Sequence, residues 1–262
     1  MAVDLYYREF GEPQAPPLVL LHGLFGSSAN WVGIARRLES AYRLIVPDLR
    51  NHGRSPHAES MSYPSMAADI LRMLDRLDSQ GADFIGHSMG GKLAMWLALT
   101  RPERVNKLLV ADITPVDYPH RFEKIFTGLR AIDLKQLSDR QEADSLLSQV
   151  IESAGVRQYL LQNLLKESDG WAWRFNLPVL QREIESLAGF PDSKGLSFPG
   201  DVLFVYGGRS DYVKPAYLPA IRETFPLARM RMLAGAGHWV YADQPEQFTQ
   251  AVTTFLKTGV KM

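Results

Sequence analysis

The chain has 262 residues, of which 46% are hydrophobic, and it contains 29 basic side chains, 29 acidic ones and no cysteine. This composition predicts a folded chain with a sizeable core, and it excludes a disordered protein, disulfides, thiolate nucleophiles and zinc sites built on cysteine. The balanced charge argues against a nucleic-acid groove or an anionic membrane surface as a partner.

The N-terminal stretch MAVDLYYREF lacks a basic region followed by a long apolar run, which is the pattern of a signal peptide. Plain apolar runs such as LVLL at residues 18–21 are far too short to cross a bilayer. We therefore expect a soluble, cytoplasmic protein with no membrane partner. The sequence carries no information on its oligomeric state.

Short apolar runs of the kind that form buried strands recur along the chain. They are rich in leucine and β-branched residues and lack alternation, as expected where helices cover both faces of a sheet. The predicted strands of this kind cover residues 17–23, 42–48, 83–88, 106–112 and 201–208, and a further strand is expected near residues 229–234. Helical patterns lie between and after them, at residues 29–40, 66–79, 90–105, 215–225 and 245–258. This alternation predicts an α/β fold with a mainly parallel, doubly wound sheet.

The alternation of strand and helix stops after Asp112. Residues 116–199 carry amphipathic helical segments and no convincing buried strand, and KGLSFPG at residues 194–200 is typical of a return loop. We therefore expect an α/β core of residues 1–115 and 200–262, with residues 116–199 inserted into it as a helical cap.

The stretch FIGHSMGGK, residues 84–92, places Ser88 between two glycines where a predicted strand gives way to a helix. A Gly-x-Ser-x-Gly match alone is weak, but this context is the one that a nucleophile elbow requires. Ser88 is expected at positive φ, with Gly86 and Gly90 leaving room where strand and helix pass closely. The helix N-terminus would offer free N–H groups to an oxyanion. The simpler alternative is a tight turn with a buried serine.

A nucleophilic serine needs a base, and chain order separates the six histidines. Only His238, in LAGAGHWV, lies beyond the last predicted core strand, in a loop that glycines leave free. It is therefore the candidate base, the alternative being a histidine that merely fills a surface loop. The other five precede that strand: His22, His52, His57, His87 and His120.

At this point the sequence resembles the α/β-hydrolase superfamily, which has Ser, acid and His in this chain order. The likeness spans nearly the whole chain through HGLFG, DLRNHGRS, GHSMGG, ADITP, GGRSDYVKP and GAGHWV. HGLFGSSANW, DLRNHGRS and the Asp-Ile-x-Pro of residues 112–115 are similar to the YbfF-type small serine esterases. The resemblance implies an oxyanion hole built from the backbone N–H groups of Leu24 and Met89.

The resemblance leaves two candidates for the acid of the triad. Asp211, in GGRSDYVKP, occupies the usual position of the superfamily, after the strand that follows the cap. Asp112 ends the strand before the cap, where YbfF-type esterases draw their acid. Those esterases commonly lack a carboxylate in the later turn, whereas this chain carries both. Either aspartate could orient the imidazole of His238, and the sequence favours Asp211 slightly.

A serine at the elbow does not supply the carboxylate nucleophile of haloalkane dehalogenases and epoxide hydrolases on this fold. The remaining reaction is acyl transfer through an acyl-serine, with water as the usual acceptor. This reaction needs no metal and no organic cofactor. The expected substrates are small esters of short- to medium-chain acids, or thioesters. Candidate substrate-binding residues are Phe25, Trp171, Trp173 and Trp239, although the cap tryptophans could equally serve only to fasten the cap to the core.

Other reactions that the same serine, histidine and acid could catalyse also fit the sequence. They include the hydrolysis of carbon–carbon bonds, lactones or thioesters, aminopeptidase activity, and a cofactor-free perhydrolase. A different class is a non-catalytic receptor for small molecules that keeps the triad for its shape. A burst of p-nitrophenol from a short ester would separate the enzymes from the receptor.

Overall fold

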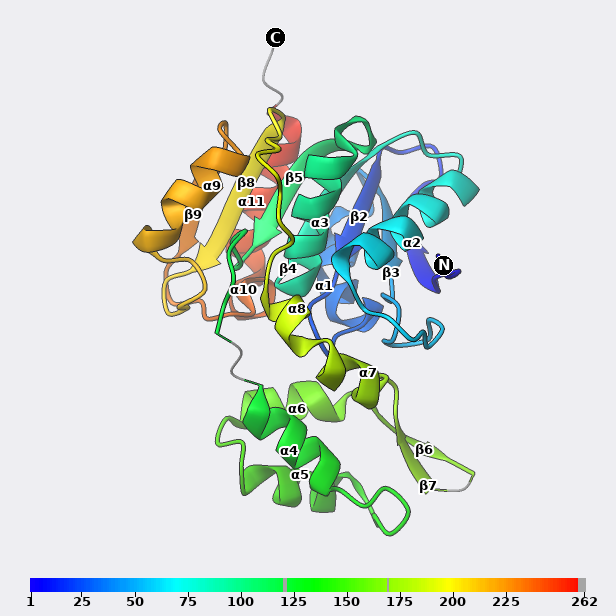
Figure 1. Cartoon of the computed structure of the whole chain (residues 1–262). Helices are drawn as coiled ribbons and strands as arrows, with labels where there is room; N and C mark the ends of the chain where they lie inside the picture. The colour runs from blue at the N-terminus through cyan, green and yellow to red at the C-terminus, as the bar shows by residue number, and fades with distance from the viewer. Residues whose placement is uncertain (120–121, 169, 259–262) are drawn as a thin grey trace.

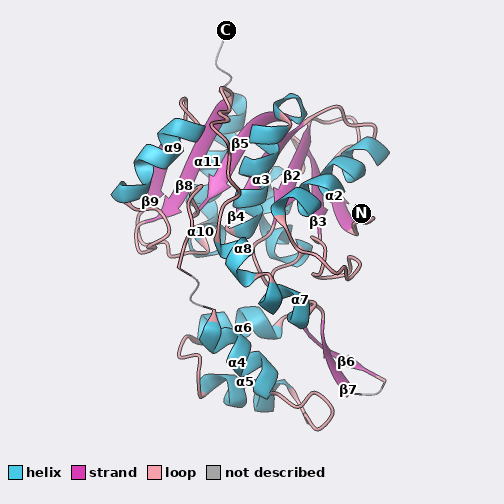
Figure 2. Ribbon diagram, viewed as in Figure 1, coloured by secondary structure: helices cyan, strands magenta, loops and turns pink. Residues whose placement is uncertain are grey.

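The computed structural model describes residues 1–119, 122–168 and 170–258. Within them, one large sheet has the strand order β1-β3-β2-β4-β5-β8-β9, and β6 and β7 form a separate antiparallel hairpin. All neighbours in the large sheet are parallel except β1 and β3. The fold is therefore the α/β fold with a mainly parallel sheet that the sequence predicts (Figures 1 and 2).

The predicted core strands lie within two residues of their expected bounds, whereas β1 was not expected. The strands are β1 Tyr7–Phe10, β2 Pro17–Leu21, β3 Arg43–Pro47, β4 Ala82–His87, β5 Val105–Ala111, β6 Leu164–Glu167, β7 Gly170–Trp173, β8 Asp201–Gly207 and β9 Arg229–Leu233. The α-helices are α1 Val32–Leu38, α2 Tyr63–Arg76, α3 Met89–Thr100, α4 Glu123–Ala131, α5 Arg140–Ser148, α6 Ala154–Leu161, α7 Leu177–Arg182, α8 Ile184–Ala188, α9 Leu218–Thr224, α10 Val240–Asp243 and α11 Pro245–Lys257. Short 3-10 turns are η1 Ser28–Trp31, η2 Pro102–Arg104 and η3 Pro215–Tyr217.

The inner strands of the large sheet are covered on both faces, which explains the apolar runs of β2, β3, β4, β5 and β8. In β2, Val19 and Leu21 belong to the cluster that includes α2 and α3, while Leu18 and Leu20 belong to the one that includes α1 and α11. Successive side chains of a strand point to opposite faces, so a strand covered on both sides needs an apolar residue at every position.

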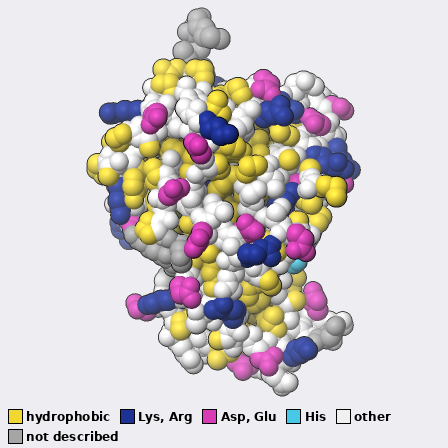
Figure 3. Space-filling model, viewed as in Figure 1, with side chains coloured by type: hydrophobic (Ala, Val, Ile, Leu, Met, Phe, Trp, Pro, Cys, Tyr) yellow, Lys and Arg dark blue, Asp and Glu magenta, His cyan; other side chains and the backbone are white. Residues whose placement is uncertain are grey.

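The chain leaves the core after β5 and returns at β8 (Figure 1). Helices α4 to α8 and the β6–β7 hairpin lie between them, and residues 120–121 and 169 of this stretch lie outside the described residues. The hairpin is a difference from the sequence analysis, which found no strand there. Its pairing of Leu164 with Trp173 fits the alternating GWAW segment. On the face shown in Figure 3, hydrophobic side chains gather where this insertion meets the core.

Lys92 fastens both ends of the insertion to helix α3. Its buried ammonium donates to the carbonyl oxygens of Val116 at 2.8 Å, Ala188 at 2.6 Å and Gly189 at 2.7 Å. The ring of Tyr118 lies 4.7 Å from the same nitrogen. The two connections of the insertion thus meet at one side chain, one helical turn after Ser88.

Strands β4, β5, β8 and β9 are consecutive neighbours in the sheet. Their carboxyl ends therefore lie along one edge, and in parallel α/β sheets such an edge is where binding sites form. The loops that follow these strands carry Ser88, Asp112, Ser210 and His238. No helix in the described part of the chain is long and apolar enough to cross a membrane.

Candidate active site

Ser88 lies in a strained turn between β4 and α3. Its backbone has φ 53° and ψ −120°, the positive φ that the sequence predicts. The flanking glycines are required by space. A Cβ on Gly86 would lie 2.2 Å from the carbonyl oxygen of Gly90, and a Cβ on Gly90 would lie 2.4 Å from that of Leu21. The motif therefore holds the serine at the start of a helix, where its side chain lines two cavities.

His238 is bound to Asp112. Its Nδ1 lies 2.7 Å from Oδ2 of Asp112, whose side chain is fully buried just beyond β5. The backbone N–H of Gly207 donates to Oδ1 at 3.0 Å, and the hydroxyl of Ser210 donates to Oδ2. This set of donors stabilises a buried carboxylate and fixes the orientation of the imidazole.

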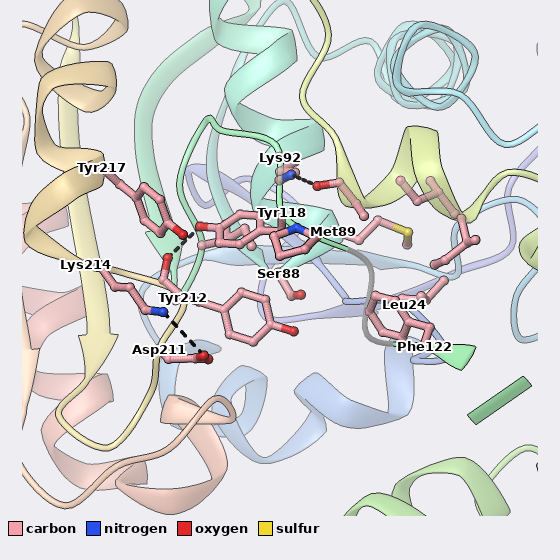
Figure 4. Close-up of a pocket in the computed structure, with 15 residues that line it drawn as sticks. Leu24, Ser88, Met89, Lys92, Tyr118, Phe122, Asp211, Tyr212, Lys214 and Tyr217 are labelled. Atoms are coloured by element: carbon pink, nitrogen blue, oxygen red, sulfur yellow. Dashed lines mark hydrogen bonds and ion pairs between the residues drawn. The ribbon is translucent and has the colours of Figure 1, made fainter. Parts of the chain in front are cut away.

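The structure does not bring Asp211 to His238 in the same way. Oδ2 of Asp211 lies 3.6 Å from the ammonium of Lys214, and the aspartate side chain is 50% exposed. Figure 4 shows this pair at the side of the pocket. Of the two acids that the sequence leaves open, the geometry at His238 thus favours Asp112 over Asp211. The Asp-Ile-x-Pro motif of residues 112–115 already points to Asp112. The sequence nevertheless favours Asp211, because Asp211 occupies the usual position of the acid in the superfamily.

Two aromatic rings flank His238, and sequence reasoning assigned neither a role. The ring of Tyr212 stacks on the imidazole with 4.1 Å between centroids and 24° between planes. The ring of His87 lies 4.6 Å away, and its Nε2 donates to the carbonyl oxygen of His238 at 2.9 Å. Burial holds the pKa of His87 well below its ordinary value, so the ring is neutral. These contacts hold both the ring and the backbone of His238.

The backbone N–H groups of Leu24 and Met89 have no acceptor within the described ranges. Phe25, at φ 61°, turns the chain beside Leu24, and its N–H donates to Nε2 of His52 at 3.1 Å. Burial lowers the pKa of His52 to about 3, so this nitrogen keeps its lone pair at neutral pH. Tyr159, on α6, donates its hydroxyl to the Leu24 carbonyl at 3.0 Å. The loop is thus fixed from the core and from the insertion.

Two cavities meet at Ser88. We call them the Lys92 cavity and the His238 cavity, each after one of the residues that line it. Both are lined by Leu24, Ser88, Phe122 and Tyr212. The Lys92 cavity is also lined by Met89, Lys92, Ile113, Tyr118, Pro119, Ile184, Leu187, Ala188, Asp211, Lys214 and Tyr217. The His238 cavity is also lined by Gly23, Phe25, His87, Ile125, Val156, Tyr159, Leu160, His238 and Trp239.

Of the four aromatic residues that the sequence suggests for substrate binding, Phe25 and Trp239 line the His238 cavity. Trp171 and Trp173 line neither cavity, since both belong to the β6–β7 hairpin. Trp173 is buried and stacks on Phe175 with 5.2 Å between centroids, while Trp171 lies beside two cationic side chains. The hairpin tryptophans therefore pack within the insertion, and α4, α6 and α8 supply the cavity walls instead.

The remaining histidines are placed as follows. His22 is buried and accepts the N–H of Leu49 at its Nε2 at 2.9 Å, and burial lowers its pKa. His57 is exposed and contacts the carbonyl oxygen of Arg174 at 3.1 Å. His120 lies outside the described residues. Among all the residues that the structure describes, no three or more His, Asp or Glu side chains are grouped so that they could hold a metal ion.

A model of the α/β hydrolase fold family matches residues 16–245. The chain belongs to this family. An α/β hydrolase of Xenopus laevis named sn-1-specific diacylglycerol lipase ABHD11 is 39% identical over 98% of this chain and 85% of its own length. Esterase YbfF of Escherichia coli K12 is 40% identical over 92% of each chain.

A solved α/β hydrolase described as a marine microorganism esterase superposes with a TM-score of 0.93. It is 38% identical, and the match covers 97% of this chain and all of that one. The resemblance to YbfF-type esterases is thereby confirmed, and the protein is a hydrolase of the carboxylesterase type.

Proposed function

We propose that this protein is a serine esterase that hydrolyses carboxylic esters through an acyl-enzyme on Ser88, with His238 as base and Asp112 as acid. The observation that carries the proposal is the buried Asp112 carboxylate 2.7 Å from Nδ1 of His238. That contact leaves Nε2 as the nitrogen that exchanges protons, and His238 and Ser88 line the same cavity.

The first step forms the acyl-enzyme. Oγ of Ser88 attacks the ester carbonyl while Nε2 of His238 takes the hydroxyl proton. The N–H groups of Leu24 and Met89 would hold the developing oxyanion, because both lack another acceptor in the described chain and Met89 begins a helix. His238 then gives its proton to the leaving alkoxide. Water repeats the sequence in reverse order and releases the acid.

The two halves of the ester go to different cavities. The leaving oxygen must receive a proton from His238, so the alcohol half belongs in the cavity that His238 lines. The acyl half then belongs in the Lys92 cavity, where Ile113, Ile184 and Leu187 are the apolar wall. This compact cavity, with polar groups at Lys214 and Tyr217, suits acyl chains of short to medium length.

We also propose that the inserted segment is the cap of this fold, with residues 116–199 as its bounds. Ile184, Leu187 and Ala188 line the acyl side, and Ile125, Val156 and Tyr159 line the alcohol side. The cap would therefore set the chain-length preference of both halves. Thioesters offer the same acyl group with a different leaving atom and belong in the same substrate panel.

The test is Ser88→Ala. It should leave the fold intact and lower the turnover of p-nitrophenyl butyrate by several orders of magnitude, since the acyl-enzyme cannot form. A fluorophosphonate probe should label the wild-type chain and not the variant. A variant that retains more than a few per cent of the activity would show that another nucleophile does the chemistry. Graded p-nitrophenyl esters, acyl-CoA thioesters and a diacylglycerol then define the substrate.

A further inference from the structure

A short turn after β2 carries one donor of the proposed oxyanion hole. The N–H of Gly26 donates to the carbonyl oxygen of Gly23 at 3.0 Å. Leu24 and Phe25 are therefore the two central residues of a β-turn. The turn lies against the nucleophile, because a Cβ on Gly23 would lie 3.3 Å from Cβ of Ser88. Phe25 has φ 61°, which the third residue of a turn normally reaches as glycine, so its surroundings must hold it there.

The insertion supplies most of the contacts that hold this turn. Tyr159 on α6 donates its hydroxyl to the carbonyl oxygen of Leu24 at 3.0 Å. The amide of Asn163, a residue that is 4% exposed, donates to the carbonyl oxygen of Phe25 at 2.7 Å. In the described part of the chain, neither carbonyl oxygen has another donor. The core contributes the contact between the N–H of Phe25 and Nε2 of His52.

The ring of Phe25 also packs on the insertion. It is 3% exposed and meets the ring of Phe126, on α4, edge-on with 5.7 Å between centroids. The ring of Phe175 meets it in the same way at 5.1 Å. Backbone and side chain of the turn are thus fixed by residues that are distant in the sequence. The conformation of the turn depends on the insertion more than on the sequence of the turn itself.

We propose that Asn163 and Tyr159 are positioning residues for the oxyanion hole, through which the insertion fixes the direction of the Leu24 N–H. These roles rest on the proposed function, in which the N–H groups of Leu24 and Met89 hold the oxyanion. A hydrogen bond weakens steeply as its angle closes, so a turn that is free to rotate gives a poorly aimed donor. The donor must also be in place before the negative charge develops. The insertion therefore acts on the reaction as well as on the shape of the cavities.

Two substitutions remove the donors and keep the shapes of the side chains. Tyr159→Phe loses the hydroxyl and keeps the ring, while Asn163→Leu loses the amide and keeps a side chain of similar size. Each should lower kcat for p-nitrophenyl butyrate about tenfold, part of the hundredfold or larger loss that follows removal of an oxyanion donor. KM should change by no more than about twofold, because the aimed N–H matters most in the transition state. A raised KM with unchanged kcat would overturn the proposal, because the two residues would then only shape the pocket.

Inhibition by 1-butaneboronic acid tests the hole without turnover. Oγ of Ser88 adds to the boron atom as its proton passes to His238, and an oxygen of the tetrahedral adduct then occupies the place of the oxyanion. The inhibition constant should rise in each variant by about the factor by which kcat/KM falls. That of butyramide, whose carbonyl group is planar, should stay unchanged. A boronic acid that binds the variants as tightly as the wild type would show that the hole is intact without these contacts.

Matched controls remove similar contacts elsewhere between the insertion and the core. Tyr63→Phe deletes a buried hydroxyl that donates to the carbonyl oxygen of Leu187 at 2.7 Å. Asn176→Leu deletes an amide that donates to Oδ1 of Asn51 at 3.1 Å. Both controls should keep kcat within about twofold of the wild-type value. A tenfold loss in the controls as well would mean that any loosened contact slows the enzyme, and it would refute a specific role of the turn.

The positioning role and the esterase itself can fail separately. The fraction of each variant that a fluorophosphonate finally labels gives its folded share, so kcat is taken per labelled site. Tyr159→Phe, the milder change, decides the outcome if Asn163→Leu does not fold. A wild-type protein that releases no p-nitrophenol would refute the proposed esterase. Release that depends on Ser88 and is equally fast in the wild type and in both variants would leave the esterase standing and refute the positioning role.

Discussion

Asp112 and Asp211 are both aspartates beside the same edge of the sheet, yet their surroundings differ in kind. Three donors face the carboxylate of Asp112: the imidazole of His238, the N–H of Gly207 and the hydroxyl of Ser210. Asp211 is half exposed and pairs with Lys214 across 3.6 Å. A carboxylate with these partners orients an imidazole, whereas a solvated pair on the surface contributes little.

Asparagine at these two positions should therefore have very different effects. Asp112→Asn should lower the turnover of p-nitrophenyl butyrate about ten-thousandfold, because His238 loses its fixed tautomer. Asp211→Asn should lower it by about tenfold at most, the scale of an outer contact. The two variants are compared at one pH after their folding is checked by circular dichroism. Losses that are equal and modest would mean that the two acids substitute for each other.

The sequence predicts the serine far better than the acid, for a local reason. The sharp turn at Ser88 needs the space that Gly86 and Gly90 leave, and both lie within two residues of the serine, so the motif itself indicates the turn. The choice of acid depends on how two loops after different strands turn toward His238. Asp112 itself adopts φ 52°, and no glycine lies beside it in the sequence to indicate this unusual conformation. Ser210, which holds Asp112, also looks like an ordinary turn residue in the sequence.

At the scale of elements, one side chain of the core joins the two connections of the insertion. Lys92 on α3 donates three hydrogen bonds to the two connections of the insertion, at Val116 and at residues 188–189. Burial lowers the pKa of Lys92 to about 7. The ammonium form therefore dominates only below neutral pH, and there its three N–H groups match the three carbonyl oxygens.

Lys92→Met should loosen both connections and remove the donor of the Val116 and Gly189 carbonyl groups, whereas that of Ala188 keeps the N–H of Tyr118. At pH 6 we expect the free energy of unfolding to fall by about 2 kcal/mol, the scale of unsatisfied buried polar groups. The preference for acyl chain length should also broaden, since Ala188 and Leu187 line the Lys92 cavity, where we propose that the acyl half binds. Urea unfolding and a graded ester panel measure the two effects. Lys124→Met, at an exposed lysine that lines neither cavity, is the matched control and should change neither.

The sequence also shows where helix and strand signals fail. GWAW in β7 alternates as a strand does, but a four-residue strand inside a helical insertion is too short to stand out. The edge strand β1, with the sequence YREF, is equally short and only partly buried. By contrast, β2 to β5 and β8 are buried on both faces, so each of them carries a continuous apolar signal. The strand order itself rests on pairings between distant segments, which no local pattern encodes.

At the scale of the whole molecule, several histidines are neutral because the fold buries them. His22, His52 and His87 are each about 1% exposed or less, and burial lowers the pKa of all three. The unfolded chain binds protons at these side chains below pH about 6.5, whereas the folded chain does not bind one at His52 until about pH 3. The contribution of these three histidines to stability is therefore fully present above pH 6.5 and is lost as the pH falls through this window.

Acid should thus lower the free energy of unfolding, in part because His52 binds a proton in the unfolded chain. Between pH 7.5 and pH 5, His52 alone should lower the free energy of unfolding by about 2 kcal/mol. His52→Gln keeps a possible acceptor for the N–H of Phe25 but cannot bind a proton in this range. Urea unfolding across the window should therefore give a flatter profile for the variant than for the wild type. Parallel profiles would show that His52 is not the group that titrates.

The position of the insertion also decides the order in which the sheet can be completed. Strand β5 pairs directly with β8 in the finished protein, with Lys107 opposite Asp201. During synthesis, however, the whole insertion emerges between them. A nascent or truncated chain that ends before residue 201 therefore exposes the edge of β5, with Leu108 to Val110 beside unpaired backbone groups, which is the template on which strands aggregate. Such fragments need a chaperone or rapid degradation, whereas the completed chain protects this edge with β8.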